Sequence, residues 1–588
     1  MPSSPSSYAP EDTSHHAAYV SAALLEKRGV KRAFVYGAPN IEPLLMAIRE
    51  RGSTELIYLR SEAAVAFAAS GYARATGELG VCISGGGPAA TNMISGIFDA
   101  QQDSVPLLIL SGQVSTYRIG TDAWQETDAI GMTASVTKHN FQPRTGGELV
   151  AMLDAGITLA RTGRAGAVFV DIPDDVLTSS AAGETLPPLM RGYRVPPPIT
   201  SATIERFYDL LSDARKPLIL MGGGSVPNNA HDVIVKLAEA WNLPIATTMT
   251  AKGAISDTHP HAVGMLGTIG RRSAVWAYQQ CDLLIAFGCR FAERMTGTPP
   301  DFQQGRHIIH IDIDEVELGK NTQPSLEIRG DSKQVATALL RHLPPDFARE
   351  RFQSWLNQCA TATGFCHRCV PHPDDGGMNP KRIMDMINQR RRSDEIVVTG
   401  AGEHESFAAH FLLHHRPRTF LASFGAGARN FGLAAAIGAA IGRPKQRVLL
   451  IEGDVGFQSS VQELANVHSL NLPILMFVLD NGAQGRAMFD DTIPTPDFVS
   501  IAQAYGIEAH HVSNARALED LLDGAWNQRT PMLLHVDVAP IRMYPRAQKG
   551  EALSAYRGNC VPESGGLFPR TEQQLIDQVA IGRIEDEP

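Results

Sequence analysis

Three features are missing from this 588-residue sequence, and each excludes a class of protein. Its seven cysteines are odd in number and scattered, so no disulfide framework is expected. It has no excess of basic residues, and its net charge of −10 argues against nucleic acid or an anionic membrane as a partner. It has no apolar run of 18 residues, so no membrane-spanning helix is predicted.

The composition of the first residues bears on targeting signals. Residues 1–15 are polar, contain no arginine and have no apolar centre, so we expect neither a secretory signal nor a transit peptide. We predict a disordered N-terminus on a cytoplasmic protein. The sequence does have a 44% apolar fraction, which is enough for several well-packed cores in a chain of this length.

Helical and strand-like segments alternate along the chain, which predicts an α/β fold of three doubly wound parallel-sheet domains. A Pro-rich linker precedes the second domain, and the end of the chain has the composition of a covering lid. The predicted boundaries are 16–185 for the first domain, 201–342 for the second, 343–378 for a linker, 379–545 for the third domain and 546–588 for the lid.

One stretch of the third domain predicts a βαβ unit. Apolar strands are expected at 448–451 and 474–479, with a helix at 459–470 between them. Asp454 and Asn481 follow the two strands, 27 positions apart (481 minus 454), and would emerge at the same edge of the sheet. Their side-chain oxygens suit a magnesium ion, and the amides of a helix beginning near Gly456 suit a diphosphate.

A plainer interpretation is an ordinary βαβ unit in which Asp454 caps a helix. The spacing from Gly453-Asp454 to Asn481 favours the other interpretation, because it resembles the diphosphate-binding motif of thiamine diphosphate enzymes. The stretch Ser61-Glu62, followed by Gly71-Tyr72-Ala73-Arg74, resembles the glutamate helix of the same enzymes, although a helix-starting glutamate on a solvated face is the plainer alternative.

Other motifs resemble one branch of these enzymes, the FAD-containing acetohydroxyacid synthases (acetolactate synthase large subunits). The resemblance covers residues 17–550. It rests on the motifs at residues 120–126, 137–140, 288–294, 310–314, 317–320 and 330–331.

The resemblance implies decarboxylation of a 2-oxoacid, with pyruvate as the expected donor, and transfer of the acyl unit to an acceptor carbonyl. Glu62 would hydrogen-bond the cofactor's pyrimidine ring, with Gln125 as a second catalytic residue. Since Glu62 and Asp454 lie in different domains but serve one cofactor, the family pattern implies a homodimer or homotetramer with active sites at the subunit interface. Thiamine diphosphate, Mg²⁺ and FAD are the implied cofactors.

The resemblance also implies ligand-binding residues. Metal ligands would be Asp454, Asn481 and the carbonyl of Ala483. The diphosphate and pyrimidine would contact Gly402, His404, Gly427, Arg429, Gly453, Gly456 and Phe457. Substrate would contact Lys138, Trp124 and Arg486. FAD would contact Gly222, Gly223, Gly224, Thr248, Met249, Leu266, Gly267, Gly288, Arg290, Arg294, Asp312, Ile313 and Asp331, unless the second domain is a plain α/β domain without a ligand.

The sequence departs from the family around the substrate. Glu403 and Glu405 flank His404 where the family has glutamines, and the methionine that supports the bent cofactor is replaced by Arg429. Arg486 also replaces an apolar residue. Two new arginines favour a more anionic or polar substrate, because guanidinium groups pair well with carboxylate or phosphate. The alternative is that each arginine pairs with a new acid such as Glu405.

Three alternatives remain open at this point. The chain could be an FAD-linked 2-oxoacid oxidase, or a cofactor-binding paralogue without catalysis. The linker residues Cys359, Cys366, Cys369 and His372 could bind zinc, although free thiols in a linker are the commoner case.

Overall fold

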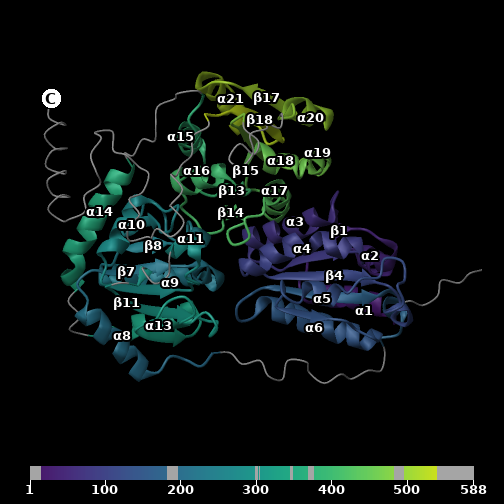
Figure 1. The fold of residues 1–588 in the computed structure, drawn as a ribbon, viewed down its shortest axis with the longest axis horizontal. Helices are drawn as coiled ribbons and strands as arrows, with labels where there is room; N and C mark the ends of the chain where they lie inside the picture. The colour runs from purple at the N-terminus through teal and green to yellow at the C-terminus, as the bar shows by residue number, and fades with distance from the viewer. Residues whose placement is uncertain are drawn as a thin grey trace, which may run out of the picture. The chain divides into compact units, whose positions relative to one another are not determined.

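We describe a computed structural model, which covers residues 15–181, 196–297, 302–303, 305–344, 349–367, 377–482 and 495–539. The chain forms three six-stranded parallel sheets flanked by helices, so the predicted fold class is confirmed (Figure 1). It divides into two compact units: residues 1–194 with 437–442, and residues 195–436 with 443–588. Among the described residues, no helix is long and apolar enough to cross a membrane.

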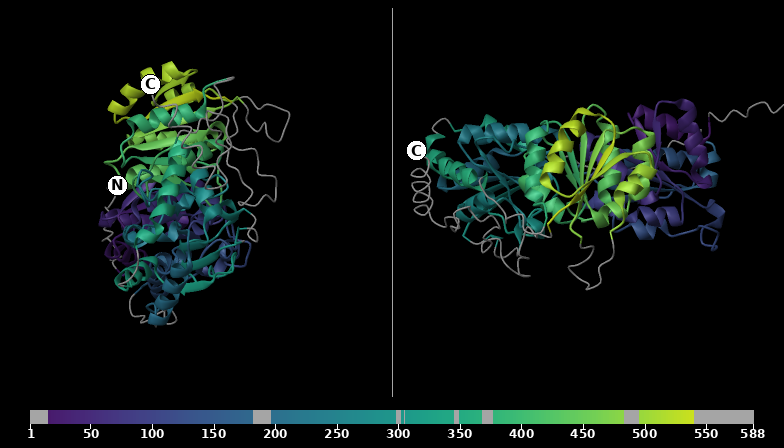
Figure 2. Two further views of the ribbon diagram at one scale, coloured as in Figure 1. Left: turned by 90° about the vertical axis from the view of Figure 1, so that its left-hand side faces the viewer. Right: turned by 90° about the horizontal axis from the view of Figure 1, so that it is seen from above.

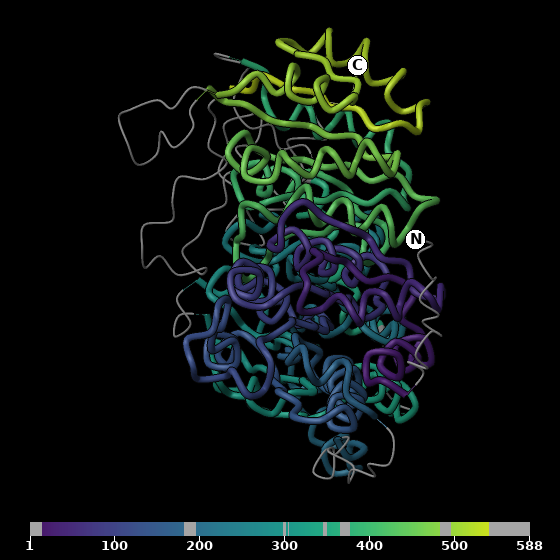
Figure 3. Tube along the Cα trace, turned by 90° about the vertical axis from the view of Figure 1, so that its right-hand side faces the viewer, coloured from purple at the N-terminus to yellow at the C-terminus, as the bar shows by residue number. Residues whose placement is uncertain are grey.

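The first sheet lies in the first unit and has the strand order β2-β1-β3-β4-β6-β5. Figure 1 shows α3 and α4 on one face of it and α1 and α6 on the other, and Figure 3 traces the chain of this unit in purple and blue. The strands are β1 (Arg32–Tyr36), β2 (Glu55–Tyr58), β3 (Gly80–Ser84), β4 (Leu107–Gln113), β5 (His139–Phe141) and β6 (Ala167–Pro173). The α-helices are α1 (Ala17–Lys27), α2 (Glu42–Arg51), α3 (Glu62–Thr76), α4 (Pro88–Gln102), α5 (Ala129–Thr133), α6 (Gly146–Arg161) and α7 (Asp174–Thr178).

Small residues bury helix α3 against its neighbours. Its start is defined by Ser61, whose hydroxyl accepts a hydrogen bond from the Ala64 amide at 3.3 Å. Every residue from 64 to 75 is buried, and one of them, Arg74, is charged. Its guanidinium pairs with Asp99 at 2.8 Å and Asp103 at 2.9 Å, so two carboxylates on the α4 side compensate the buried charge. The helix that carries Glu62 is therefore held rigidly.

The second sheet has the order β12-β11-β10-β7-β8-β9. Alternate residues of its strands face opposite cores: Ile219 and Met221 pack with α8, α9 and α13, while Leu218 and Leu220 pack with α10 and α14. The strands are β7 (Pro217–Met221), β8 (Ile245–Thr247), β9 (Ala262–Met265), β10 (Leu283–Phe287), β11 (His307–Asp312) and β12 (Leu326–Arg329). The helices are α8 (Ser201–Asp213), α9 (Ala230–Trp241), α10 (Arg272–Gln280), α11 (Glu293–Thr296), α13 (Ser332–Arg341) and α14 (Gln353–His367).

The third sheet has the order β14-β13-β15-β16-β18-β17, and the right-hand view of Figure 2 shows its strands side by side between helices. The strands are β13 (Ile396–Thr399), β14 (Phe420–Ala422), β15 (Val448–Gly453), β16 (Ile474–Asp480), β17 (Glu508–Val512) and β18 (Met532–Asp537). The helices are α15 (Pro380–Arg390), α16 (Glu403–Phe411), α17 (Phe431–Gly442), α18 (Asp454–Gln458), α19 (Leu464–Ser469), α20 (Phe498–Ala504) and α21 (Ala515–Asn527).

One predicted element of the βαβ unit is wrong. Instead of a single helix over 459–470, the connection holds α18, a 3₁₀ turn (Val461–Glu463) and α19. The helical path starts at Asp454, directly after β15, and not near Gly456. Ser459 and Ser460 separate α18 from the 3₁₀ turn, and serine favours turns because its hydroxyl competes for backbone partners. Apolar spacing alone does not detect such breaks.

The first and third sheets share one topology, since the strand numbers of the third exceed those of the first by 12 throughout. In each sheet the first strands are added toward one edge, and the chain then returns to the other side of its first strand and adds the remaining strands toward the opposite edge. The reversal lies between β1 and β3 in the first sheet, between β10 and β7 in the second, and between β13 and β15 in the third. Ligands of open α/β sheets bind at the carboxyl ends of the strands at this reversal.

Candidate active site

Asp454 lies at the carboxyl end of β15. Its side chain is buried, and its Oδ2 has no hydrogen-bond partner among the described residues. Burial raises the pKa of this carboxyl, and the charge of Asp480 raises the pKa further. A buried carboxylate oxygen without a partner is costly unless a cation or a donor meets it. This orphaned oxygen fits a magnesium ligand.

The neighbouring strand delivers Asn481 to the same edge. Gly453 on β15 pairs with Leu479 on β16, so Asp454 and Asp480 leave the two strands side by side, and Asn481 follows directly. An acidic residue and an amide residue thus follow neighbouring strands at one edge of the sheet, the placement that the spacing in the sequence predicts for a magnesium site. The other predicted residues of this loop, Ala483 and Arg486, lie outside the described residues.

Asp480 holds the turn that carries Asn481, a role that the sequence analysis missed. Its carboxylate accepts hydrogen bonds from the Gly482 amide at 2.7 Å and from His535 Nε2 at 3.0 Å. Burial would raise the pKa of Asp480, but the hydrogen bonds from His535 and Gly482 lower it overall. His535 sits on β18, 55 positions away, and only the strand pairing brings it here. No local sequence signal reveals this contact.

His404 lies in α16, which follows β13 at the reversal of the third sheet. Its Nε2 is 3.0 Å from the Gly400 carbonyl and 3.1 Å from a carboxylate oxygen of Glu452. Burial alone would lower the pKa of His404, but the hydrogen bond and charge of Glu452 raise it above its ordinary value. The site therefore holds a buried histidine–glutamate pair that the sequence analysis did not predict.

The remaining predicted diphosphate and pyrimidine residues lie around the same reversal. Gly456 and Phe457 are buried in α18, and Gly402 precedes α16. Gly427 adopts a φ of +66°, which favours glycine, two residues before an exposed Arg429. Glu405 is buried and pairs at 3.3 Å with Arg294. The described structure thus pairs Glu405 with Arg294 of helix α11 and shows no such pair for Arg429.

In the first unit, Glu62 is the first residue of α3 and is half-buried. Its carboxylate accepts a hydrogen bond from Asn92 Nδ2 on α4 at 3.2 Å, and Asn92 is itself exposed. A rigid helix start and one amide donor therefore orient the carboxylate while leaving it accessible.

The other predicted residues of the first unit differ in their surroundings. Gln125 has a positive φ of +67°. Its backbone lies close to Gly87: a Cβ added at Gly87 would be 2.6 Å from the backbone carbonyl oxygen of Gln125. Trp124 is 84% exposed. The Lys138 ammonium donates to the carbonyls of residues 159, 162 and 164, at 2.6–2.8 Å, and so stabilises the end of α6. These three hydrogen bonds give Lys138 a structural role, and its contact with substrate stays a prediction.

The predicted FAD residues gather at the carboxyl edge of the second sheet. The loop 222–224 follows β7, and Gly288 follows β10, the strand on the other side of the reversal. The two loops pack backbone against backbone, since a Cβ at Gly224 would be 2.8 Å from the Gly288 Cα. Asp312 ends β11, the next strand. Glycine loops and an acid at such an edge fit a dinucleotide.

Two of the predicted FAD residues have a sufficient structural role of their own. Asp331 caps α13 by accepting from the amides of Lys333 and Gln334 at 3.1 and 3.0 Å. Arg294 pairs with Glu405, as described above. Leu266 is buried, and Gly267 adopts a φ of +142°. The hydroxyls of Thr248 and Thr250, on either side of Met249, are hydrogen-bonded at 2.9 Å. Arg290 and Ile313 lie at the same edge, after β10 and β11.

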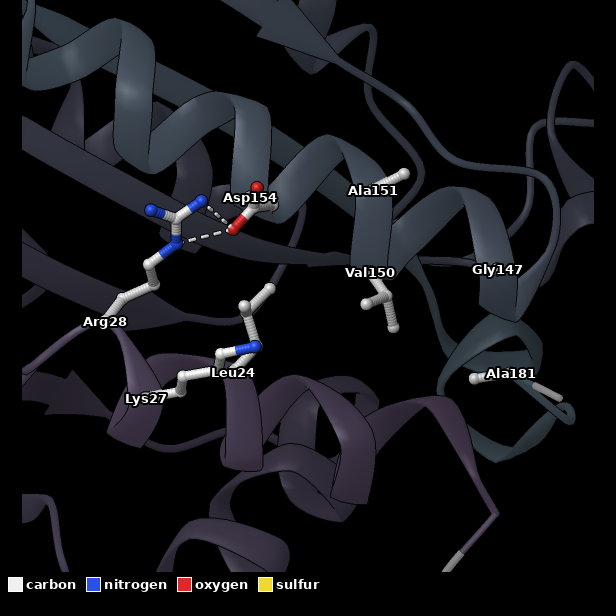
Figure 4. Close-up of a pocket in the computed structure, with 8 residues that line it drawn as sticks. All are labelled: Leu24, Lys27, Arg28, Gly147, Val150, Ala151, Asp154 and Ala181. Carbon is white, nitrogen blue, oxygen red and sulfur yellow. Dashed lines mark hydrogen bonds and ion pairs between the residues drawn. The ribbon is translucent and has the colours of Figure 1, made fainter. Parts of the chain in front are cut away.

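Two further features lie away from these edges. A hollow between α1 and α6 is bordered by an ion pair between Arg28 and Asp154, and none of the predicted site residues lines it (Figure 4). Cys359 is a buried free thiol in the core beside α10. No group of potential metal ligands occurs among the described residues, and Cys369 and His372 lie outside them.

Comparison with known proteins identifies three domains along the chain. Three domain models match: the N-terminal thiamine pyrophosphate-binding domain over residues 15–132, the central domain of thiamine pyrophosphate enzymes over 204–339, and the C-terminal thiamine pyrophosphate-binding domain over 400–536. Each domain model covers one of the three sheets in large part.

Individual relatives extend the match to almost the whole chain. The probable acetolactate synthase large subunit of Methanocaldococcus jannaschii is 35% identical over 90% of this chain and 93% of its own length. The acetolactate synthase isozyme 2 large subunit of Escherichia coli is 35% identical over 87% and 94%. An acetolactate synthase of Mycobacterium bovis is 34% identical over 85% and 84%. The chain belongs to the acetolactate synthase large-subunit family of thiamine diphosphate enzymes.

Proposed function

We propose that this protein decarboxylates pyruvate and joins the acyl unit to an acceptor carbonyl, using thiamine diphosphate and Mg²⁺. Family membership favours this carboligase chemistry over the oxidase and paralogue alternatives. The observation that carries the cofactor assignment is the orphaned, buried Oδ2 of Asp454 beside Asn481 at one sheet edge.

Each residue of the site has a separate task. Thiamine diphosphate supplies the electron sink for decarboxylation when it is bound. Asp454, Asn481 and the Ala483 carbonyl would hold the magnesium ion, which neutralises the diphosphate. Glu62 would hold a proton at its carboxylate, where Asn92 keeps it oriented. The rigid α3 keeps that carboxylate in place.

We further propose a homodimer or homotetramer that binds FAD at the second sheet. The quaternary proposal is supported by the family pattern and by the location of Glu62 and Asp454 in different units. The FAD proposal is supported by the glycine loops and Asp312 at the reversal. Flavin absorbance of the purified protein, and its mass in solution, test these two statements.

For the acceptor, we propose a compound more anionic or polar than the substrates typical of the family. Exposed Arg429, on the loop before α17, supports this proposal, together with Arg486. Arg429→Met keeps the apolar stem and deletes the charge. We expect nearly unchanged affinity for the cofactor and a loss of about 2–3 kcal/mol in kcat/KM. Unchanged turnover of the native substrate would show that the charge has a structural role.

One experiment separates the candidate functions. The purified protein is incubated with thiamine diphosphate, Mg²⁺, pyruvate and a panel of aldehydes, ketones and 2-oxoacids, and products are analysed by mass. Carbon dioxide release with a carboligation product, while the flavin stays oxidised, is the expected result. Catalytic bleaching of the flavin would identify an oxidase. Binding of the cofactor without carbon dioxide release from any 2-oxoacid would identify a non-catalytic paralogue.

A further inference from the structure

Glu452 occupies a chamber made by three glycines. It lies near the end of β15, and its side chain is buried. Gly400 after β13, Gly432 in α17 and Gly456 in α18 surround its carboxylate, and a Cβ at any of them would come closer to a carboxylate oxygen than real Cβ atoms do. Three separate elements therefore have glycine at the positions that contact this carboxylate.

The two oxygens of the carboxylate have unequal surroundings. Oε1 accepts a hydrogen bond from the Gly453 amide at 3.2 Å and lies 3.1 Å from His404 Nε2. Oε2 is buried and has no hydrogen-bond partner among the described residues. A buried carboxylate with one unpaired oxygen is costly, so simple filling of space is a poor explanation for an acid here.

The contact determines how the His404 ring is oriented. Nε2 faces two oxygens, those of Gly400 and Glu452, and must therefore carry a proton. The other nitrogen, Nδ1, lies on the opposite side, where a Cβ at Gly402 or Gly453 would be 2.7 or 2.9 Å away. Gly453 immediately precedes Asp454, so Nδ1 borders the loop that would hold the magnesium diphosphate. Only glycine at both positions leaves this ring edge uncovered.

We propose that Glu452 is a positioning residue for the cofactor: it locks the His404 ring so that Nδ1 is presented to the diphosphate. The inference rests on the proposed use of thiamine diphosphate. The carboxylate of Glu452 also favours the imidazolium form of His404, so the pKa of His404 is raised despite its burial. An imidazolium can donate a hydrogen bond from Nδ1 to an anionic ligand. Glu405, which also faces His404, is paired with Arg294.

The test is a double-mutant cycle on ligand affinity. The Kd of thiamine diphosphate and that of thiamine, which has no phosphates, are measured by calorimetry at saturating Mg²⁺ in the full-length protein. The variants are Glu452→Gln, His404→Gln and the double variant. Glu463→Gln is the matched control, because Glu463 is another buried glutamate of the same βαβ connection and bonds to Asn466 at 2.7 Å. Thermal melting reports folding.

We expect each single variant to weaken thiamine diphosphate binding about 10-fold, roughly what loss of one hydrogen bond to a charged group costs. The double variant should be no worse than either single one, since both remove the same contact to the ligand. Thiamine affinity should stay unchanged in all of them, and Glu463→Gln should bind both ligands as the parent does.

Additive losses, or equal losses for both ligands, would overturn the inference and make Glu452 a packing residue. If Glu452→Gln does not fold, the two ligands are compared in Glu452→Asp instead. This variant keeps the charge, but its shorter side chain places the carboxylate farther from His404. Failure of the parent to bind thiamine diphosphate would overturn the proposed function along with it. Tight binding by the parent with unaltered binding by Glu452→Gln would overturn the inference alone.

Discussion

Two glutamates of the first unit, Glu42 and Glu62, each occupy the first position of a helix. Both therefore interact in the same way with the positive end of the helix dipole. They differ in surroundings: Glu62 accepts a hydrogen bond from Asn92, whereas Glu42 is exposed. A charge-removing substitution at the two positions separates a catalytic role from a helix-capping role.

We expect Glu62→Gln to lower the rate of carbon dioxide release from pyruvate by at least 100-fold, which is roughly what loss of a positioned acid–base group costs. Glu42→Gln should retain the parent rate, because only the helix-dipole interaction is lost. Both variants should melt within a few degrees of each other. A Glu62→Gln variant with more than about half of the parent rate would contradict the proposed role.

A second residue of the first unit, Asp171 on β6, links stability to pH. It is fully buried; its Oδ2 accepts from Gln142 at 2.8 Å and Gln113 at 3.1 Å, and Oδ1 has no partner among the described residues. Burial raises the pKa of Asp171 to about 6, which outweighs the two hydrogen bonds. The folded state thus keeps the proton up to about pH 6, while the unfolded chain loses it near pH 4.

Protonated Asp171 therefore stabilises the folded state fully below about pH 4, and this stabilisation is lost as the pH rises through 6. The free energy of unfolding falls by about 3 kcal/mol over this range. We expect Asp171→Asn to remove this loss. The melting temperature of the variant relative to the parent should rise between pH 4 and about 6 and then stay constant. The control Asp154→Asn, at a half-buried carboxyl that pairs with Arg28, should show no such rise. A pH-independent difference for Asp171→Asn would show that the carboxyl titrates normally.

At the scale of elements, the βαβ unit combines a charged turn with tightly packed strands. Strands β15 and β16 pair over six positions. A polar residue follows each strand directly: Asp454 after β15 and Asn481 after β16. The unpaired oxygen of Asp454 is a local cost that a bound cation would remove. This unit should accordingly be more stable with its metal than without it.

We expect Mg²⁺ with thiamine diphosphate to raise the melting temperature of the parent but not of Asp454→Asn, because ligands that bind only the folded state stabilise it by mass action. Without Mg²⁺, Asp454→Asn should melt no lower than the parent, since the amide removes a buried charge. Asp385→Asn, which breaks a surface pair with Lys381, is the control and should respond to the ligands as the parent does. An equal response to the ligands in Asp454→Asn would exclude Asp454 as the metal ligand.

At the scale of the whole molecule, the first and third sheets repeat one strand order, and each carries half of the proposed cofactor site. Glu62 belongs to one compact unit and Asp454 to the other. The proposed dimer completes each site with one residue from each subunit. This arrangement has a direct test that needs no further structure.

Glu62→Gln and Asp454→Asn should each be inactive alone, yet an equal mixture that is allowed to exchange subunits should regain activity. Half of the dimers would then be mixed, with one intact site and one doubly altered site, so about a quarter of the parent activity is expected. Activity is measured as carbon dioxide release before and after dissociation and reassembly. No recovery after confirmed exchange would place both residues of a site in the same chain.

Local sequence patterns were sufficient for the fold class and the edge of the third sheet. Apolar runs mark buried strands because water is excluded from both faces of a parallel sheet, and the residues that follow them must then lie at its carboxyl edge. Asp454 and Asn481 were predicted in this way. The helix over 459–470 was not predicted correctly, because apolar spacing does not register the serines that interrupt it.

The sequence by itself thus determined the three sheets, the family resemblance and the polar residues at the strand ends, because these depend on periodicity and short spacings. Only the tertiary structure decided which polar groups meet. The contacts of Glu452 with His404, of Asp480 with His535 and of Glu405 with Arg294 join residues 48, 55 and 111 positions apart. Strand pairing and domain packing bring such groups together, and no local pattern records them.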